Sequence, residues 1–401
     1  MIARILPGKA TGIVSAPPSK SMAHRLLIAA ALAEGASTIQ NVSLSQDTLA
    51  TADSLAILGQ RVQIDNGTAV LAPSPAANEV CVRESGSTLR FLIPLALTLG
   101  HPVTFTGAKR LFERPLSVYE TLAKEEGFQF DRQEDRLTVC GRLQPKTYRF
   151  RGNVSSQFIS GLLFALPGLS ADSRIELIPP VESRPYIDMT MQALSLFGVR
   201  TCWLDDVTIL IPGNQHPEGR SVTVEGDYSN AAFLEMLNLF GGDVQVTGLS
   251  PDSLQGDRIY QEYFPRLKED APVLDIRDCP DLGPVLFVAA AVCGGGHFTG
   301  TERLRIKESD RLACMQEELA KFGIQTEIGD NTFTVLPGML KEPAERLCGH
   351  NDHRIVMALS SLLTLTGGEI EGAEAVRKSW PDYFTVLQNL GIEVVLHAVD
   401  Q

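Results

Sequence analysis

The 401-residue sequence predicts a two-domain α/β protein with an inside-out, barrel-like fold of six βαβαββ repeats, three in each domain. The first observation is a pattern that occurs six times: an apolar run ends in glycine, a strand-like stretch follows, and a second helical pattern precedes a strand pair. The second observation is that several helical runs are apolar on nearly every face, which is typical of buried helices. The third is the length, which exceeds what one ordinary core accommodates. Together they predict helices inside and sheets outside.

Glycines mark the end of each predicted helix, where the C-cap favours a residue without a side chain. The first helix of the six repeats ends at Gly35, Gly100, Gly168, Gly241, Gly294 and Gly367. The second helix ends at Gly59, Gly127, Gly198, Gly323 and Gly391. The fourth repeat has no such second glycine, which predicts that it is degenerate.

The most uniformly apolar helical runs are residues 26–33 and 285–292, and we expect both to be buried. The repeats divide into a domain of residues 19–224 and a discontinuous domain of residues 1–18 plus 225–401. If the helices within each domain run parallel, their N-termini face a cleft between the domains, and we expect the active site there.

The composition narrows the class of partner. The formal charge of −13 argues against nucleic acid or an anionic membrane, and an apolar content of 44% is typical of globular proteins. We expect neither a signal peptide nor a membrane span. The seven scattered cysteines contain no Cys-x-x-Cys pair and are interpreted as reduced core residues of a cytoplasmic protein.

Basic residues recur at or just inside predicted helix starts, against this acidic average. A helix N-terminus carries partial positive charge and unpaired N–H groups, so it disfavours Lys and Arg unless an anion binds there. We therefore expect several helix ends to surround one bound polyanion. The residues concerned are Lys20, Arg25, Arg90, Arg114, Arg184, Lys307, Arg311, Arg354 and Lys378.

Three of these helix starts combine cations or glycine with hydroxyl groups. Segment 18–25 places Ser21 and Arg25 on one face, segment 84–90 contains Gly86, and segment 154–157 contains Ser155, Ser156 and Gln157. Each arrangement suits a phosphate. Each can also be an ordinary helix cap with exposed neighbours, since serine is a preferred N-cap residue.

Two segments place arginine directly before a proline that can occupy a first helical turn, namely Arg114-Pro115 and Arg184-Pro185, the latter preceded by Ser183. A guanidinium can hold a carboxylate or phosphate with two hydrogen bonds. The recurrence at equivalent repeat positions favours a binding role.

The densest charged group is segment 306–311, where Lys307 and Arg311 are expected one helical turn apart on one face, beside Glu308 and Asp310. A solvated face with ion pairs is the alternative. Like charges at this spacing are unfavourable unless an anion or an acid lies between them. Asp281, before an uncharged helical run, is either a helix cap or a proton acceptor.

Segment 349–354 contains two histidines and an aspartate, which could suggest a metal. Capping by Asn351 or Asp352, with Arg354 directed at a ligand, explains the segment more simply, and we expect no metal. Lys378 closes the series, before a helix expected to start at Pro381.

Taken together, these motifs resemble the enolpyruvyl transferase family, and most closely its members of the shikimate pathway. The resemblance covers almost the whole chain. It rests on Ser19-Lys20-Ser21 with Arg25, Ser155-Ser156-Gln157, Ser183-Arg184-Pro185-Tyr186, Lys307-Glu308 with Asp310-Arg311, and Asn351-Asp352-His353-Arg354.

The resemblance implies transfer of an enolpyruvyl group from phosphoenolpyruvate to the 5-hydroxyl of shikimate 3-phosphate, with release of phosphate and without a metal or organic cofactor. It implies that shikimate 3-phosphate contacts Lys20, Ser21, Arg25, Ser155, Ser156, Gln157, Ser183, Asp281 and Lys307. It implies that phosphoenolpyruvate contacts Lys20, Gly86, Arg114, Gln157, Arg311, Arg354 and Lys378. Asp281 would accept the hydroxyl proton, and Glu308 with Lys20 would move protons at the methylene carbon. We expect a cytoplasmic monomer.

The sequence departs from the family pattern at three places. Segment 84–87 replaces the common Asn-Ala-Gly-Thr and adds the carboxylate of Glu84, Arg303 stands where asparagine is usual, and Pro17-Pro18 replaces Pro-Gly. Two alternatives remain. A related transferase acting on a UDP-linked amino sugar usually carries a cysteine in the loop corresponding to residues 107–114, which has none here. A non-catalytic receptor for phosphorylated metabolites would need the cations but not Asp281 or Glu308.

Overall fold

The computed structural model describes residues 1–270 and 272–398, and these residues form two compact units. Unit one comprises Met1–Pro17 together with the described residues from Gly226 onward, and unit two comprises Pro18–Glu225. Each unit has a separate hydrophobic core. The N-terminal segment therefore belongs to the C-terminal unit because its two strands complete sheets there.

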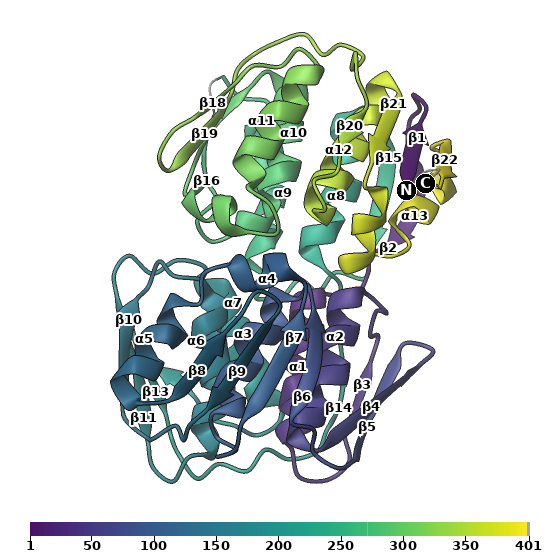
Figure 1. The fold of residues 1–401 in the computed structure, drawn as a ribbon. Coiled ribbons are helices and arrows are strands. Elements are labelled where there is room, and N and C mark those ends of the chain that lie inside the picture. Colours follow the sequence, from purple (N-terminus) through teal and green to yellow (C-terminus); the bar gives the residue numbers. More distant parts are fainter. Residues whose placement is uncertain (271, 399–401) are drawn as a thin grey trace. The chain divides into compact units, whose positions relative to one another are not determined.

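Unit two is built from three four-stranded sheets around a group of helices (Figure 1). The strands are β3 (Thr38–Gln40), β4 (Gln60–Asp65), β5 (Thr68–Pro73), β6 (Glu79–Arg83), β7 (Val103–Gly107), β8 (Gln129–Arg132), β9 (Arg136–Cys140), β10 (Thr147–Arg151), β11 (Ser173–Ile178), β12 (Cys202–Trp203), β13 (Thr208–Ile211) and β14 (Ser221–Thr223). The helices are α1 (Lys20–Leu32), α2 (Gln46–Ser54), α3 (Gly86–Ala96), α4 (Lys109–Glu113), α5 (Ser117–Glu126), α6 (Ser156–Ala165) and α7 (Arg184–Leu196), with 3-10 turns η1 (Leu55–Leu58) and η2 (Leu166–Gly168).

The three sheets of unit two share one topology, with strand orders β14-β3-β5-β4, β6-β7-β9-β8 and β10-β11-β13-β12. In each sheet the first pair is parallel and the next two pairs are antiparallel. A helix connects each parallel pair within the second and third sheets, because parallel strands need a crossover connection. Three copies of the predicted βαβαββ unit are thus present.

Unit one contains the same arrangement with one reduced copy. Its strands are β1 (Ile2–Ile5), β2 (Thr11–Ser15), β15 (Asp243–Thr247), β16 (Val273–Asp275), β17 (Gly296–Thr299), β18 (Thr326–Ile328), β19 (Thr332–Val335), β20 (Leu347–Cys348), β21 (Gly368–Glu371) and β22 (Val394–His397). Its helices are α8 (Tyr228–Leu239), α9 (Tyr260–Arg266), α10 (Gly283–Cys293), α11 (Arg311–Lys321), α12 (His353–Thr366) and α13 (Tyr383–Asn389), with turns η3 (Gly256–Ile259), η4 (Pro280–Leu282), η5 (Glu302–Ile306) and η6 (Ala373–Lys378).

Two sheets of unit one, β16-β17-β19-β18 and β20-β21-β1-β22, repeat the parallel-antiparallel-antiparallel pattern. The third consists only of the parallel pair β15 and β2. This reduced sheet belongs to the fourth repeat, and the prediction that this repeat is degenerate is confirmed. After α9 the chain proceeds to β16 without a strand pair of its own.

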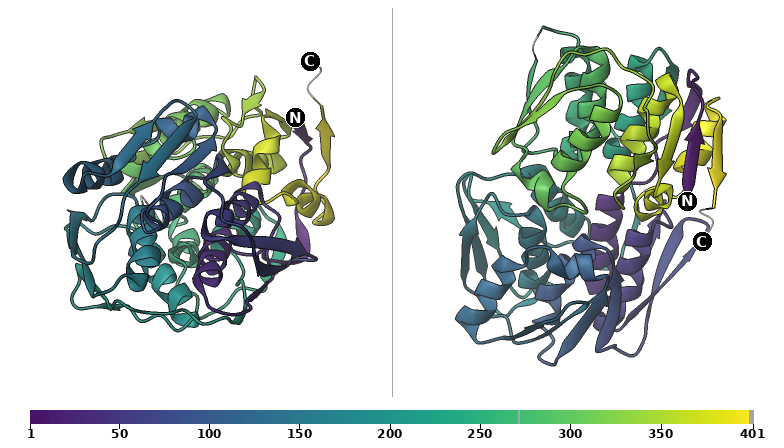
Figure 2. Two further views of the ribbon diagram at one scale, coloured as in Figure 1. Left: turned by 60° about the horizontal axis from the view of Figure 1, so that its bottom comes forward. Right: turned by 45° about the horizontal axis from the view of Figure 1, so that its top comes forward.

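The helices at the centre of each unit are buried on nearly all faces, as their composition predicts. In α1 every residue from Met22 to Ala31 is buried, and in α10 every residue from Gly283 to Ala291 is buried. The helices lie side by side with strands toward the outside of each unit (Figures 1 and 2). On the strands the burial alternates, so that Ile175 and Leu177 of β11 face the core.

Side-chain caps begin most of the first helices of the repeats. A backbone N–H in the first turn of α1, α3, α6, α8 and α12 donates a hydrogen bond to the side chain of Ser19, Ser85, Ser155, Asp227 and Asp352, respectively. The capping predicted for serines and for Asp352 is therefore correct. Helix α10 differs, because its N-cap is Leu282 and Asp281 lies in the preceding turn η4.

Two interpretations of the sequence were wrong in the fold. All seven cysteines are in the described part of the chain and are free, but Cys279 alone is buried, while Cys81 and Cys202 are exposed. Scattered positions in a sequence do not report which face of a strand a side chain occupies. Pro115 and Pro381 precede their helices, which begin at Ser117 and Tyr383, whereas Pro185 does lie in the first turn of α7.

No helix within residues 1–270 and 272–398 combines the length and the apolar character that crossing a bilayer requires.

Candidate active site

The starts of α3 and α6 in unit two are joined through Gln157. Its Oε1 accepts a hydrogen bond from Arg90 Nη1 at 2.8 Å, and its Nε2 donates to Ser87 Oγ at 2.9 Å. The Arg90 guanidinium also donates to the carbonyl of Pro115 at 3.1 Å, next to Arg114. Two helix N-termini and two arginines therefore meet at one end of the unit.

Gly86 is the first residue of α3, and its missing side chain leaves room for the guanidinium of Arg114. A Cβ atom at Gly86 would lie 2.6 Å from Arg114 Nη1 and 2.9 Å from Arg90 Nη1. Both arginines are buried. The sequence interpreted Gly86 as a point of close approach to a ligand, and in the fold it is a point of close approach to cations.

Arg25 links α1 to α7 and is almost fully buried. It donates to Thr190 Oγ1 at 2.8 Å, to the Tyr186 carbonyl at 2.9 Å and to the Ser21 carbonyl at 2.7 Å. Burial lowers the pKa of Arg25 to about 10, which still leaves it charged at neutral pH. Because three of its hydrogen bonds go to the protein, Arg25 positions the start of α7 as well as adding charge.

The remaining predicted residues of unit two lie at the same helix starts. Lys20, the first residue of α1, donates to Asp47 Oδ2 at 2.9 Å, and both side chains are largely shielded from solvent. Ser155 caps α6, and Ser156 is its first residue. Ser183 precedes α7 with a φ of 55°, in the left-handed region, and is buried. A non-glycine residue in that region is uncommon and occurs preferentially at functional sites.

Asp281 is the centre of the corresponding cluster in unit one. Its Oδ1 accepts hydrogen bonds from Lys307 Nζ at 3.1 Å and from Arg311 Nη1 at 3.0 Å, and Arg354 Nη2 lies 3.7 Å from its Oδ2. Lys307 and Arg311 are thus brought together by an acid between them, as predicted. The predicted helix over both is wrong, because Lys307 is extended after η5 and α11 begins at Arg311.

Arg311 is held by three carboxylates. Its side chain contacts Asp281, Glu308 at 3.0 Å and Asp352 at 2.8 Å, and it is only 1% exposed. Although burial lowers the pKa of Arg311, these three carboxylates raise it above its ordinary value. For Lys307 burial is the larger effect, and its pKa falls despite the nearby Asp281.

Arg354 is the second residue of α12 and is 3% exposed. Within the described residues its Nε and Nη1 atoms have no hydrogen-bond partner, and its guanidinium lies over the Phe233 ring. A buried charged donor without a partner is costly, so this geometry favours a bound anion. Lys378 donates to the Asn351 carbonyl at 2.7 Å, one turn from Arg354.

In unit two the predicted residues lie at or beside the starts of α1, α3, α6 and α7, and in unit one Lys307, Arg311 and Arg354 surround Asp281. Three residues that contact the predicted site residues were not assigned to the site from the sequence. Asp47 holds Lys20, Thr190 holds Arg25, and Asp352 both caps α12 and holds Arg311. Asp352 was predicted only as a cap, and no sequence signal could connect it with Arg311, 41 residues earlier. Arg303, at the position where the family pattern has asparagine, is buried and donates to the Arg277 carbonyl.

The fold and these clusters of charged residues indicate the class of protein. Two internally repeated α/β units carry buried guanidinium groups at helix N-termini, and one unit adds carboxylates among its cations. Such an arrangement is typical of enzymes that act on small polyanions.

The chain belongs to the EPSP synthase family. The family model described as EPSP synthase (3-phosphoshikimate 1-carboxyvinyltransferase) matches residues 6–387. A 3-phosphoshikimate 1-carboxyvinyltransferase of Clostridium kluyveri is 40% identical and one of Clostridium novyi is 35% identical, each alignment covering 97% of both chains. The predicted resemblance to enolpyruvyl transferases is confirmed. Membership of this family also shows that the protein is a transferase of aromatic amino acid biosynthesis.

Solved structures share the fold. An EPSP synthase from Acinetobacter baumannii matches with a TM-score of 0.79 at 22% identity, over 98% of this chain and 100% of that one. The enolpyruvyl transferase NikO from Streptomyces tendae matches with a TM-score of 0.77 at 14% identity, over 98% of both chains. At these identities the likeness confirms the two-domain α/β fold and does not separate one substrate from another.

Proposed function

We propose that this protein transfers the enolpyruvyl group of phosphoenolpyruvate to the 5-hydroxyl of shikimate 3-phosphate and releases inorganic phosphate. Family membership supports the reaction. The single structural observation that carries the proposal is the contact of Asp281 with Lys307 and Arg311, near Arg354. Proton transfer needs a carboxylate, and binding needs cations, and this cluster contains both.

The reaction has two steps with a tetrahedral intermediate. In the first, the 5-hydroxyl oxygen bonds to C2 of phosphoenolpyruvate, its proton leaves, and a proton adds to C3, which becomes a methyl group. In the second, the bond from C2 to the phosphate oxygen breaks, phosphate leaves, and the methyl group returns a proton to restore the double bond. The protein must therefore supply two proton-transfer groups and stabilise several negative charges.

Shikimate 3-phosphate is assigned mainly to unit two. Ser21, Arg25, Ser155, Ser156, Gln157 and Ser183 would contact it, with Lys20, Asp281 and Lys307. The hydroxyl and N–H groups at the start of α6 suit a phosphate, because a helix N-terminus offers donors without requiring a counter-charge. This role is compatible with the caps described above, since Ser155 caps its helix and Ser156 adds a second hydroxyl.

Phosphoenolpyruvate is assigned to the guanidinium groups. Arg114 with Gly86 in unit two, and Arg311, Arg354 and Lys378 in unit one, would hold its phosphate and carboxylate, with Lys20 and Gln157. The buried Arg354 supports this assignment most directly, because an anion would satisfy its Nε and Nη1 donors. A guanidinium can bind a carboxylate or phosphate with two parallel hydrogen bonds.

Three side chains are assigned to proton transfer. Asp281 would accept the hydroxyl proton, since bound anionic substrates would draw Lys307 and Arg311 toward themselves and leave the carboxylate available. Glu308 and Lys20 would exchange protons with C3. Glu308 contacts Arg311 at 3.0 Å and is partly exposed, which would let it reach a ligand. This chemistry requires neither a metal nor an organic cofactor.

The assignment uses residues of both units for one reaction, and we propose that they act together at an interdomain active site. We further propose that the protein acts in the cytoplasm as a monomer, with small-molecule substrates and without nucleic acid or membrane partners. The negative net charge supports the last point.

Two other functions make different predictions. A transferase acting on a UDP-linked amino sugar would release phosphate with that sugar in place of shikimate 3-phosphate. A receptor for phosphorylated metabolites would bind its ligand without turnover. The carboxylates Asp281 and Glu308 among the cations favour an enzyme, because a receptor for anions gains nothing from them.

The test is an assay of phosphate release with both substrates and with each omitted in turn. We expect repeated turnover only when phosphoenolpyruvate and shikimate 3-phosphate are both present. Binding of either substrate without turnover of the pair would refute the proposal. Phosphate release with phosphoenolpyruvate and the UDP-linked sugar, but not with phosphoenolpyruvate and shikimate 3-phosphate, would also refute it.

A further inference from the structure

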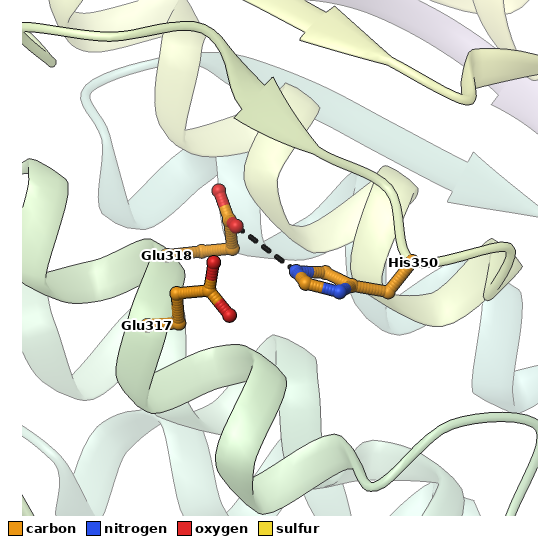
Figure 3. A group of neighbouring side chains, drawn as sticks. All are labelled: Glu317, Glu318 and His350. Carbon is orange, nitrogen blue, oxygen red and sulfur yellow. Dashed lines mark hydrogen bonds and ion pairs between the residues drawn. The ribbon is translucent and has the colours of Figure 1, made fainter.

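A cluster of side chains of metal-ligating types lies in unit one on α11 and the segment beside it, and it contains none of the residues assigned to catalysis. Cys314, Glu317 and Glu318 are spaced i, i+3, i+4 and therefore lie along one face of the helix. Strand β20 packs against α11 and brings Cys348 and the following His350 to this face. Figure 3 shows the Glu317 and Glu318 carboxylates extending from the helix toward the His350 ring.

The distances among Glu317, Glu318 and His350 suit a single ion. One ligand atom each from Glu317, Glu318 and His350 lie within 4.8 Å of one another, and His350 Nε2 is 2.9 Å from Glu318 Oε1. Tetrahedral zinc, with bonds of about 2.1 Å to nitrogen or oxygen and about 2.3 Å to sulfur, places its ligand atoms about 3.5 Å apart. Small side-chain rotations would close the cluster around such an ion.

Both cysteines contact the histidine. The His350 ring is hydrogen-bonded to the side chain of Cys314, and the His350 backbone N–H donates to Cys348 Sγ at 3.4 Å. Glu318 also accepts from the Cys348 backbone N–H at 3.0 Å, so the carboxylate and the thiol are held in one place. Nitrogen, sulfur and carboxylate oxygen together are the donor set of zinc, whereas magnesium and calcium prefer oxygen alone.

Lys321 occupies the next turn of the same face and contributes the charge that an ion would replace. Its ammonium contacts both oxygens of Glu318, at 2.9 and 3.0 Å. Glu318 itself is fully buried, while the Lys321 side chain is 18% exposed. The lysine can therefore move into solvent when a divalent ion takes over the neutralisation of Glu318.

We propose that Glu317, Glu318 and His350, with the Cys314 thiol as the fourth ligand, form a structural zinc site. Binding would release protons, because the thiol must become a thiolate and the imidazole must be neutral in order to coordinate the metal. The ion would tie α11 to the segment that leads from Cys348 to Asp352. Asp352 holds Arg311, so the site lies beside the catalytic cluster and would stabilise it without taking part in the reaction.

The test is titration of the metal-free, reduced full-length protein with zinc chloride by calorimetry. We expect one equivalent to bind with a dissociation constant of about 1 µM or lower. Cobalt(II) should give a thiolate-to-metal charge-transfer absorption. The variants Cys314→Ser and Glu317→Gln should each weaken zinc binding about tenfold or more. Glu317 is exposed, so its variant will fold even if another does not.

Matched controls come from the same unit. Cys293→Ser and His397→Asn alter partly buried and exposed residues outside the cluster and should leave the affinity unchanged. Absence of saturable binding at about 100 times the expected dissociation constant would overturn the proposal. Equal affinity in Cys314→Ser, Glu317→Gln and the two controls would also overturn it, because binding would then be adventitious.

Discussion

Replacement of Gly86 by alanine should weaken the binding of phosphoenolpyruvate without destabilising the fold. The added Cβ would lie 2.6 Å from Arg114 Nη1, a distance that side chains essentially never show. The φ of Gly86 is outside the left-handed region, so alanine fits the backbone of α3. The conflict is therefore between the methyl group and two flexible guanidinium groups, and Arg114 must move farther than Arg90, whose Nη1 would lie 2.9 Å from the Cβ.

The magnitude follows from the geometry. Arg114 Nη1 must shift by about 0.8 Å to reach an ordinary contact of 3.4 Å. A hydrogen bond of about 2.8 Å to a bound anion would lengthen to about 3.6 Å, at which it is lost. A hydrogen bond to a charged group contributes about 1.5–3 kcal/mol, so the KM for phosphoenolpyruvate should rise about 10- to 150-fold.

The stability of the folded protein should rise slightly or stay the same. Alanine has a higher helix propensity than glycine by up to about 1 kcal/mol, and the end of a flexible arginine moves at little cost. We therefore expect the free energy of unfolding in urea to stay within about 1 kcal/mol of the parent, and the KM for shikimate 3-phosphate to change about twofold or less.

The assay is steady-state phosphate release with one substrate varied and the other saturating. Gly168→Ala is the control, because a Cβ there meets nothing within 4 Å. An unchanged KM for phosphoenolpyruvate in a folded Gly86→Ala protein would refute the reasoning. Equal weakening of both substrates would also refute it, since Arg114 would then serve neither one selectively.

Three further predictions concern charged or buried groups. Asp281→Asn should lower kcat about 100-fold or more while shikimate 3-phosphate still binds by calorimetry, and a rate close to that of the exposed control Asp330→Asn would contradict the proton-acceptor role. Arg354→Lys keeps the charge but loses the planar donors, so it should raise the KM for phosphoenolpyruvate about tenfold; a change below twofold would remove this residue from the binding site. His24 is buried, and burial, followed by Lys20 and Arg25, holds its pKa well below 6.5. Below pH 6.5 the unfolded chain binds a proton that the folded chain does not, so stability falls as pH falls, by up to about 1.4 kcal/mol per pH unit. His24→Asn should reduce that slope between pH 6.5 and 5.5 in urea unfolding, and an unchanged slope would show that His24 is not responsible.

The repeat architecture could be predicted because it depends on residues that are close together in the sequence. Glycines with positive φ, such as Gly59, Gly127 and Gly323, end helices because only glycine adopts that conformation without strain, and they recur at fixed places in the repeat. The all-round apolar run at 285–292 predicted the burial of α10 because a helix without a polar face cannot lie at a surface. Helix starts at Ser19, Ser85 and Ser155 followed from capping chemistry.

The residues of the candidate site were named from the sequence, but the contacts among them were not. The sequence indicated that an anion or an acid lies between Lys307 and Arg311, but a contact with Asp281, 26 and 30 residues away, depends on how η4 and α11 pack. The proposed zinc site could not be predicted from the sequence for the same reason, since its ligands are far apart along the chain. The motif at 349–354 offered His350, while Cys314 and Glu317 are more than 30 residues earlier on another helix.

The sequence by itself determined the six repeats, the weakness of the fourth, the helix starts that are capped by serine, and the family. Each of these depends on neighbouring residues, whose conformational preferences and spacing are local properties of the chain. Only the tertiary structure decided which charges are paired. Asp281 joins Lys307 and Arg311 rather than capping α10, and Asp352 supports Arg311, because the burial of guanidinium groups selects carboxylates by their position in space and not by their distance along the chain.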